Sequence, residues 1–319
     1  MQTLSNFTHV DAKDLSEAVE LLSGDSAVAI AGGTDLLGVM RFRILREYPE
    51  TVVNLKTISP SLDYIKEEGG FLKVGALTRL EDIAVSSIVK SKYTALAQAA
   101  ERTASPHIRE SGTIGGNICQ HNRCWYFWKE ENRFDCIRKG GNMCYAMAGE
   151  NRFHSIFGAL NACVAVNPSD TAPALVVLNA KIITTKREIA AEDFWAFSIP
   201  GSTVLEKGEI VKEIQFPAPA AGVKSAFAKF AMRRSIDFPI ANCAAAIGGG
   251  SARICLNAVY NKPYRATKAE DSIKGKTIDT DSAETAAAAG VSSATALALN
   301  KYKISVAKGV MKQAILACK

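Results

Sequence analysis

Five of the eight cysteines of this 319-residue chain lie within one 45-residue window, which runs from Cys119 to Cys163. A chain of this length can build a stable core without disulfides, so thiols gathered in this way first indicate a metal site. Four thiolates suit either a [4Fe-4S] cluster or a structural zinc ion, and the spacing does not choose between them. No C-x-x-C pair occurs, in contrast to zinc ribbons and bacterial ferredoxins.

Two loops with paired glycines offer a different chemistry, the binding of an anion. They have the sequences AGGTDLL, residues 31–37, and TIGGNI, residues 113–118. Glycine lets a backbone approach a ligand closely, successive N–H groups form an anion-binding nest, and a helix that begins there adds its dipole. Thr34, Thr113 and Asn117 add side-chain donors. Neither loop matches a Rossmann fingerprint or a P-loop, and each alone is typical of a tight turn, but the two together favour a diphosphate site.

Regular elements must position these residues, and the hydrophobic periodicity predicts them. A helix begins at Leu15, after a capping box formed by Asp14 and Glu17, and this part is typical of a small βα unit. The other elements expected before residue 217 are strands over 27–30, 51–55, 71–76, 162–166, 180–185 and 210–216, and helices over 36–44, 79–103 (two helices) and 172–178.

The last part of the chain shows a different order of elements. Three runs with β character, over 225–232, 242–248 and 252–260, precede alanine-rich helical stretches, the last of them over about 303–317. Strands followed by helices predict an α+β domain with an antiparallel sheet. The stretch PAPAAG, residues 217–222, is typical of a linker in front of this domain.

These patterns divide the chain into three units, residues 1–57, 58–217 and 222–319. Within the second unit, the segment of about 118–163 shows no clear periodicity and contains most of the cysteines, together with the aromatic run 125–128. We expect this segment to be an insertion that is ordered by something other than a hydrophobic core.

Taken together and in this order, the motifs resemble those of the flavin-binding subunits of the molybdenum hydroxylases, the xanthine dehydrogenase and carbon monoxide dehydrogenase family. Besides the glycine loops, NPSDTAPAL at 167–175, VGALTRLEDI at 74–83 and KFAMRRSIDFPIAN at 229–242 resemble family stretches, so the resemblance covers essentially the full length. It implies an α+β fold like that of vanillyl-alcohol oxidase (PCMH-type). In this fold two α/β subdomains hold FAD non-covalently, and a C-terminal α+β domain with an antiparallel sheet and helices follows.

The resemblance also implies which residues bind FAD. Ser169 and Asp170 match positions that line the flavin site, Lys229 matches a basic residue near the isoalloxazine ring, and Val211 matches an aliphatic residue that contacts the ring. The residues alone leave alternatives, because Ser169 or Asp170 could cap the following helix and Lys229 could be an exposed strand residue. No residue of this chain is expected to be catalytic. The full set implied for FAD is Ile30, Ala31, Gly32, Gly33, Thr34, Asp35, Leu36, Ala104, Ile108, Gly112, Thr113, Gly115, Gly116, Asn117, Ser169, Asp170, Val211 and Lys229.

The insertion resembles that of a subset of the family, which includes the flavin subunits of 4-hydroxybenzoyl-CoA reductase and of a bacterial aldehyde oxidoreductase. The stretches that carry this resemblance are RCWYF at 123–127, GGNMC at 140–144, GENRFHSIFG at 149–158 and ACVAVNPSD at 162–170. The resemblance implies a [4Fe-4S] cluster bound by Cys124, Cys136, Cys144 and Cys163. Cys119 is the rival of Cys163 as the fourth ligand, and we favour a small buried thiol for Cys119. His154 is expected to be a hydrogen-bonded structural histidine.

The resemblance implies an oxidoreductase subunit that transfers electrons and works only beside partner subunits. These partners are a molybdopterin-containing large subunit, on which the organic substrate reacts, and a small subunit with two [2Fe-2S] clusters, in a heterohexamer. A ferredoxin-like or nicotinamide electron partner is expected near the extra cluster, with the substrate, the terminal partner and the direction of flow left open. Two alternatives remain from the residues alone: a non-enzymatic zinc-binding scaffold protein, and a stand-alone FAD oxidase of the vanillyl-alcohol-oxidase type.

Composition restricts the remaining classes of protein. The net charge of +6 comes from 38 Lys and Arg against 32 Asp and Glu, and the basic residues are scattered, which does not indicate nucleic-acid binding. No apolar run reaches membrane-spanning length, and the N-terminal MQTLSNFTHVDAKD lacks the pattern of a signal peptide. We therefore expect a cytoplasmic protein without membrane contact.

Overall fold

The first of the three sheets in the described part of the chain is parallel. The computed structural model describes residues 3–319, and this sheet has the strand order β1-β3-β2. The carboxylate of Asp14 accepts a hydrogen bond from the backbone N–H of Glu17 at 2.9 Å, which confirms Asp14 as the N-cap of the first helix. The carboxylate of Glu17 accepts instead from the backbone N–H of Lys13, at 2.7 Å, one residue earlier than a capping box requires. The elements are β1 (Thr8–Asp11), α1 (Leu15–Ser23), β2 (Ala27–Ile30), α2 (Leu36–Arg41) and β3 (Thr51–Asn54).

The second sheet is antiparallel and has five strands in the order β4-β5-β8-β6-β7. Its strands are β4 (Ile65–Glu68), β5 (Phe71–Gly75), β6 (Lys181–Thr184), β7 (Glu188–Ala190) and β8 (Val211–Pro217). The helices of this part are α3 (Leu80–Val85), α4 (Ser87–Lys92), α5 (Thr94–Glu101), α6 (Pro106–Arg109), α7 (Ile114–Cys119) and α8 (Ala172–Val177), with the short 3₁₀ helices η1 (Ile137–Lys139) and η2 (Ala191–Asp193).

Two expectations for this part are wrong in detail. The region 79–103 contains three helices rather than two, because Ser86 ends α3 and its hydroxyl caps α4 by accepting from the N–H of Val89 at 3.5 Å. The strand expected over 162–166 does not form. Its residues make isolated bridges, such as that between Val166 and Arg123, so this stretch pairs with the insertion instead of joining a sheet.

The C-terminal sheet is antiparallel, as the sequence predicts, and has the order β12-β11-β10-β9, in which the short β12 is a fourth strand beyond the three expected runs. Helices α9 to α11 bury alanine side chains against it, including Ala286, Ala307 and Ala314, and such small residues let helix and sheet approach closely. The elements are β9 (Lys224–Phe230), β10 (Ala241–Gly248), β11 (Ser251–Asn257), β12 (Tyr264–Arg265), α9 (Thr267–Ile273), α10 (Thr280–Gly290) and α11 (Tyr302–Leu316).

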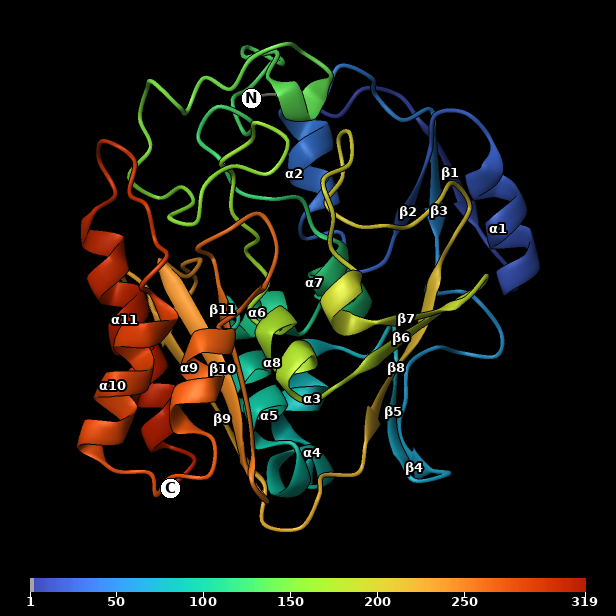
Figure 1. Ribbon diagram of the computed structural model, residues 1–319. Coiled ribbons are helices and arrows are strands. Elements are labelled where there is room, and N and C mark those ends of the chain that lie inside the picture. The colour runs from blue at the N-terminus through green and yellow to red at the C-terminus, as the bar shows by residue number, and fades with distance from the viewer. Residues whose placement is uncertain (1–2) are drawn as a thin grey trace.

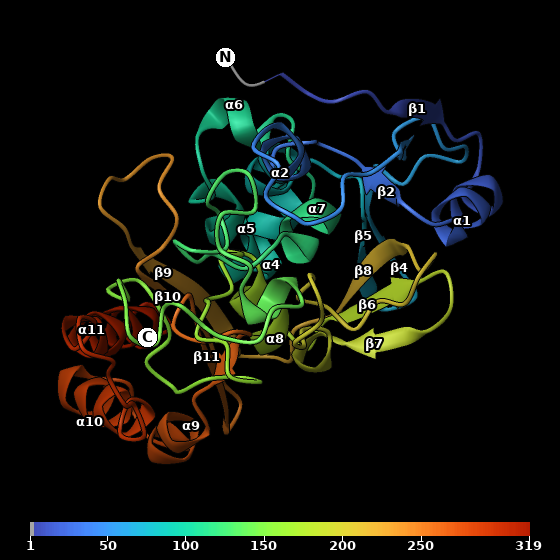
Figure 2. The same ribbon diagram turned by 90° about the horizontal axis from the view of Figure 1, so that it is seen from above.

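The helices of the middle part form a layer between the two antiparallel sheets (Figures 1 and 2). One buried cluster runs through this layer, from Leu72 of β5 through Leu96 of α5 and Leu175 of α8 to Cys255 of β11. The loops of the insertion lie at the top of Figure 1, next to α2. The predicted site residues therefore lie where the N-terminal sheet, the helical layer and the insertion meet. Among the helices of residues 3–319, none combines the length and the apolar character that crossing a bilayer requires.

Candidate functional site

The two glycine loops touch each other through their backbones. A Cβ atom on Gly32 would lie 2.2 Å from the carbonyl oxygen of Ser111, so only glycine fits at this crossing. Gly33 has a φ of +70°, which turns the chain from β2 into α2. A Cβ atom on Gly115 would lie 2.7 Å from the carbonyl oxygen of Ala76, so this glycine lets α7 lie against the end of β5. Gly33 thus has the positive φ that glycine permits, while Gly32 and Gly115 let backbone segments of the chain approach each other closely.

Helix α7 begins at the second glycine loop, where the side chains of Thr113 and Asn117 are hydrogen-bonded. The hydroxyl of Thr113 caps it by accepting from the N–H of Gly116 at 3.1 Å. The side-chain oxygen of Asn117 accepts from the hydroxyls of Ser169 and Thr171, each at 2.6 Å. The hydroxyl of Ser169 also accepts from the N–H of Ala172, the first residue of α8, at 3.1 Å. The PSD motif is therefore fixed to the glycine loop by buried hydrogen bonds, while Thr171 is the N-cap of α8 and makes no side-chain capping bond, so neither Ser169 nor Asp170 occupies the N-cap position.

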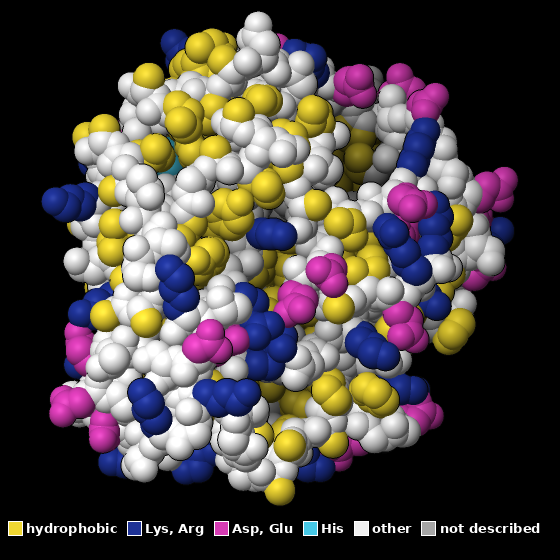
Figure 3. Space-filling model, in the orientation of Figure 1, with side chains coloured by type: hydrophobic (Ala, Val, Ile, Leu, Met, Phe, Trp, Pro, Cys, Tyr) yellow, Lys and Arg dark blue, Asp and Glu magenta, His cyan; other side chains and the backbone are white. Residues whose placement is uncertain are grey.

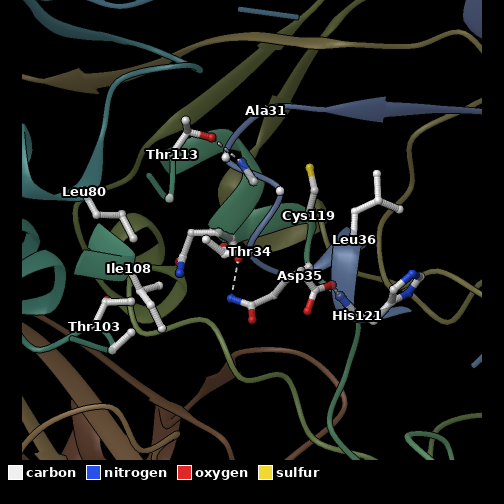
Figure 4. A pocket seen from close by; sticks show the side chains of 18 of the residues that line it. Ala31, Thr34, Asp35, Leu36, Leu80, Thr103, Ile108, Thr113, Cys119 and His121 are labelled. Carbon is white, nitrogen blue, oxygen red and sulfur yellow. Dashed lines mark hydrogen bonds between the residues drawn. The ribbon is translucent and has the colours of Figure 1, made fainter. Parts of the chain in front are cut away.

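Between the loops lies a cavity of about 530 Å³, a size typical of small-ligand sites. Figure 4 shows Leu80, Thr103 and Ile108 together at one side of it, and Leu36 with His121 at the other. Most of the residues predicted for FAD line this cavity: Ile30, Ala31, Gly32, Gly33, Thr34, Asp35, Leu36, Ala104, Ile108, Gly112, Thr113, Gly116, Asn117 and Asp170.

Four predicted residues do not line the cavity. Gly115 contacts Ala76, and Ser169 supports Asn117, as described above. Lys229 reaches the cavity through Asp170, to which it is bonded. Val211 lies in the buried core of the five-stranded sheet.

Asp170 and Lys229 form a buried ion pair at the edge of the cavity. Lys229 Nζ donates to Asp170 Oδ2 at 2.6 Å, and each side chain is 3% exposed. Asn242 Nδ2 donates to Asp170 Oδ1 at 2.7 Å, and Lys229 Nζ also donates to the carbonyl of Arg102 at 2.9 Å. Burial raises the pKa of Asp170, and the ammonium of Lys229 opposes this effect. The side chain of Lys229 is thus buried and paired, which excludes the exposed strand residue as an alternative.

Some residues that line the cavity were not predicted from the sequence. They come from the insertion and from the loop between β9 and β10. Arg123 forms an ion pair with Asp35, whose carboxylate also accepts from the backbone N–H of His121 at 3.1 Å. The guanidinium of Arg123 lies 4.0 Å from the ring centre of Trp128 and 4.3 Å from that of Phe238. The arginine that starts the RCWYF motif was the one available signal.

Three of the four predicted cluster ligands lie near one another inside the insertion. Burial raises the pKa of the Cys124 thiol to about 12, and the nearby thiols of Cys163 and Cys136 contribute to this rise. The N–H of Ile137 donates to the carbonyl of Met143 at 2.9 Å, which joins the segments that carry Cys136 and Cys144. Within residues 3–319, no three His, Cys, Asp or Glu side chains are close enough to hold a single metal ion.

Nitrogen atoms surround these thiols. His154 Nε2 lies 3.1 Å from Cys124 Sγ, and Arg138 Nε donates to Cys163 Sγ at 3.4 Å. Burial lowers the pKa of His154 to about 4, so the imidazole is neutral at pH 7. His154 is thus buried and in contact with a thiol, as expected of a structural histidine.

Cys119, the rival ligand, lies elsewhere. It lines the glycine-loop cavity, and burial raises the pKa of its thiol to about 12.

The surface of the insertion is rich in apolar side chains. Trp125, Met143 and Met147 are each about half exposed, at 49%, 52% and 49%. Figure 3 shows hydrophobic side chains gathered on the upper part of this face, where Figure 1 places the insertion. Exposed apolar surface of this kind is typical of regions that contact another protein.

Sequence comparison identifies the family. The family described as "FAD binding domain in molybdopterin dehydrogenase" matches residues 5–219, and that described as "CO dehydrogenase flavoprotein C-terminal domain" matches residues 226–318. The chain belongs to the FAD-binding medium subunits of the molybdenum hydroxylases. It is therefore an oxidoreductase subunit of the xanthine dehydrogenase family.

Individual relatives agree with this family. The chain is similar to the aldehyde oxidoreductase FAD-binding subunit PaoB of Escherichia coli, with 34% identity over 252 residues, or 76% of this chain and 77% of the relative. It is 29% identical to the glyceraldehyde dehydrogenase medium chain of Sulfolobus acidocaldarius, over 86% of this chain and 83% of the relative. A solved structure of carbon monoxide dehydrogenase from Hydrogenophaga pseudoflava matches it with a TM-score of 0.76 and 27% identity, over 99% of this chain and 98% of that one.

These comparisons confirm the fold class predicted for this medium subunit. The PCMH-type FAD-binding part is followed by the C-terminal α+β part, as expected. The sheets and helices described above make up these two parts. FAD binding and membership of a molybdenum hydroxylase family are likewise confirmed.

Proposed function

We propose that this medium subunit holds FAD and a [4Fe-4S] cluster and transfers electrons between a partner subunit and an external acceptor or donor. The inner partner is a small subunit with two [2Fe-2S] clusters, and the organic substrate reacts on a molybdopterin-containing large subunit. The observation that carries the FAD part is the backbone contact between Gly32 and Ser111, which brings both glycine loops to one cavity. The half-exposed Trp125, Met143 and Met147 support contact with partner subunits, in an assembly that we expect in the cytoplasm.

The cavity fits FAD in size and in chemistry. It adjoins a second cavity of about 510 Å³ and shares Val28, Leu36 and His121 with it, which gives room for an extended ligand. The loop of 32–35 and the capped start of α7 offer backbone N–H groups for the diphosphate. Thr103, Ala104 and Asp170 would lie toward the flavin. When bound, FAD would supply reversible two-electron redox chemistry, while the protein supplies binding and electrostatics.

The donor set of the insertion suits a cluster better than a zinc ion. A zinc ion holds its ligands at about 2.0–2.3 Å, so four zinc ligands must converge closely. A four-iron cluster is larger and holds its cysteines further apart. The thiols of Cys124, Cys136 and Cys163 lie near enough to influence one another, and this is what supports a site shared by several thiolates. Cys163 is preferred to Cys119 as a ligand, because Cys119 lines the FAD cavity.

Cofactor analysis of the anaerobically purified chain tests the proposal. We expect flavin absorption bands over a broad brown shoulder, with about four iron and four sulfide per chain, as ligation by four cysteines requires. Flavin with zinc and no iron would contradict the cluster and leave the FAD part standing. Rapid oxidation of a small organic substrate by the isolated chain would favour a stand-alone FAD oxidase instead.

A further inference from the structure

Two cations are buried in η1, immediately after Cys136. Arg138 is 1% exposed and Lys139 is 4% exposed. Moving a charge out of water is costly, so a buried cation is normally matched by an anion. None of the ion pairs within residues 3–319 includes either residue. Neither cation therefore has a carboxylate of the described chain in direct contact.

Arg138 points its guanidinium at a predicted cluster ligand. Its Nε donates to Cys163 Sγ at 3.4 Å, while its other nitrogens donate to the carbonyl of Gly201, at 2.6 Å, and to the side-chain oxygen of Asn261. These acceptors fix the orientation of the guanidinium. Only the sulfur among them can become an anion, and it does so when Cys163 binds a metal.

Lys139 is held beside the other ligands without an acceptor of its own. Its Nζ is buried and has no hydrogen-bond partner within residues 3–319, and it lies 5.3 Å from the ring centre of Phe127. Burial lowers the pKa of Lys139, and the nearby Cys136, Cys124 and Asp135 oppose this effect without reversing it. Asp135 is paired with Arg46, and Lys139 forms no ion pair with a carboxylate of the described chain.

We propose that Arg138 and Lys139 are positioning residues that supply the counter-charge of the metal–thiolate cluster and thereby raise its reduction potential. This inference rests on the proposed function. A cluster with four cysteinate ligands is anionic, and its reduction adds one electron. A nearby buried cation stabilises the reduced form more than the oxidised form, because the reduced form carries more negative charge. The N–H bond from Arg138 to the Cys163 sulfur acts in the same direction.

Lys139→Met is the most informative variant. This variant removes the positive charge and keeps an apolar side chain of similar length next to Phe127. Because Lys139 Nζ donates no hydrogen bond within the described chain, the substitution takes no donor away from any acceptor. Lys139→Arg keeps the charge. The matched control is Lys66→Met, an exposed residue of β4, at the opposite end of the molecule in Figure 1. Arg138→Lys is a second variant, although Gly201 and Asn261 would lose bonds in it.

The readout is a potentiometric titration of the full chain with dithionite as the electron donor, followed by the electron paramagnetic resonance signal of the reduced cluster. We expect the equilibrium constant for reduction to fall at least tenfold in Lys139→Met, which is 59 mV for a one-electron couple. Lys139→Arg should restore most of this shift, and Lys66→Met should cause none. Iron and sulfide should stay at wild-type levels in all three variants.

The possible results distinguish a failure of the counter-charge inference from a failure of the proposed cluster itself. An unchanged potential in Lys139→Met, with full iron content, would overturn this inference alone. Because Lys139 also lines the second cavity, loss of FAD with an unchanged potential would assign its ammonium to the flavin site and overturn the inference too. A wild-type chain without iron would overturn both the cluster and its counter-charge.

Discussion

The glycine-loop cavity and the cysteine insertion are neighbours, yet they are held in different ways. In the cavity the polar side chains find partners within the chain: Asp170 is bonded to Lys229 and Asn242, and the side-chain oxygen of Asn117 accepts two hydroxyls. Regular elements carry these residues. After the end of α7 at Cys119, the insertion contains one short 3₁₀ helix, η1, and no other helix or strand among its described residues.

Unsatisfied polar atoms show the same contrast. Nine buried side-chain atoms within residues 3–319 have no hydrogen-bond partner, although buried polar groups normally have one. Six of the nine belong to the insertion, on His121, Asn122, Arg123, Asn132, Lys139 and His154, and two of these six, His121 and Arg123, also line the cavity. We conclude that the protein forms most of the FAD cavity by itself, whereas the insertion needs a bound group to complete it.

The largest effect expected is the removal of a cluster ligand. In Cys124→Ala we expect loss of essentially all iron, because metal sites of this kind contribute on the order of 10 kcal/mol to the folding of the segment that binds them. Limited proteolysis should then cut within residues 118–163, while FAD absorbance is retained. The control is Cys119→Ala, which should keep its iron because Cys119 lines the other cavity. Iron retained in the first variant, or lost in the second, would contradict this division.

Breaking the buried ion pair of Asp170 and Lys229 tests whether the cavity is held by contacts within the chain. Asp170→Asn leaves the ammonium of Lys229 buried without a counter-charge, and breaking a buried pair in this way costs about 3–5 kcal/mol of unfolding free energy. Chemical denaturation measures this loss. The double variant Asp170→Asn with Lys229→Met should recover at least half of it. A loss below about 1 kcal/mol in the single variant would show that the pair is not the buried contact described.

The crossing of the glycine loops is expected to be less costly but more specific for FAD. In Gly32→Ala the added methyl group would collide with the carbonyl of Ser111, so the two loops must separate. We expect FAD to bind at least tenfold more weakly and the unfolding free energy to fall by about 1–3 kcal/mol. Gly309→Ala is the control, since its Cβ meets open space on helix α11 and should stabilise the chain by about 1 kcal/mol. Equal FAD affinity in both variants would refute the role of the crossing.

The smallest effect concerns the link between the two regions. Arg123→Ala removes the half-buried ion pair with Asp35 and should lower the unfolding free energy by about 1–3 kcal/mol, with weaker FAD binding. Arg152→Ala breaks an exposed pair with Glu150 within the insertion, and should cost about 0–1 kcal/mol. Equilibrium unfolding and FAD titration compare the two. If both variants behave alike, Arg123 does not connect the insertion to the cavity.

Local signals in the sequence predicted much of the cavity. Paired glycines, the N-cap at Asp14 and the strands of the C-terminal sheet depend on neighbouring residues, so their pattern was visible. The pairing of Arg123 with Asp35 joins positions 88 residues apart, and the Phe238 loop comes from the C-terminal part, so no local pattern marked them. The strand expected over 162–166 failed for a related reason: its backbone makes isolated bridges with Arg123 and Leu160 of the insertion, which has no periodicity to reveal them.

Hydrogen exchange of the FAD-loaded chain, measured before and after removal of iron by a chelator under anaerobic conditions, tests the central comparison most directly. We predict that residues 120–163 lose protection when iron is removed, because their buried polar atoms then lack the group that completes them. The glycine loops, residues 27–41 and 106–119, should keep theirs. Unchanged protection in the insertion, or an equal loss in both regions, would contradict the view that the two sites are held in different ways.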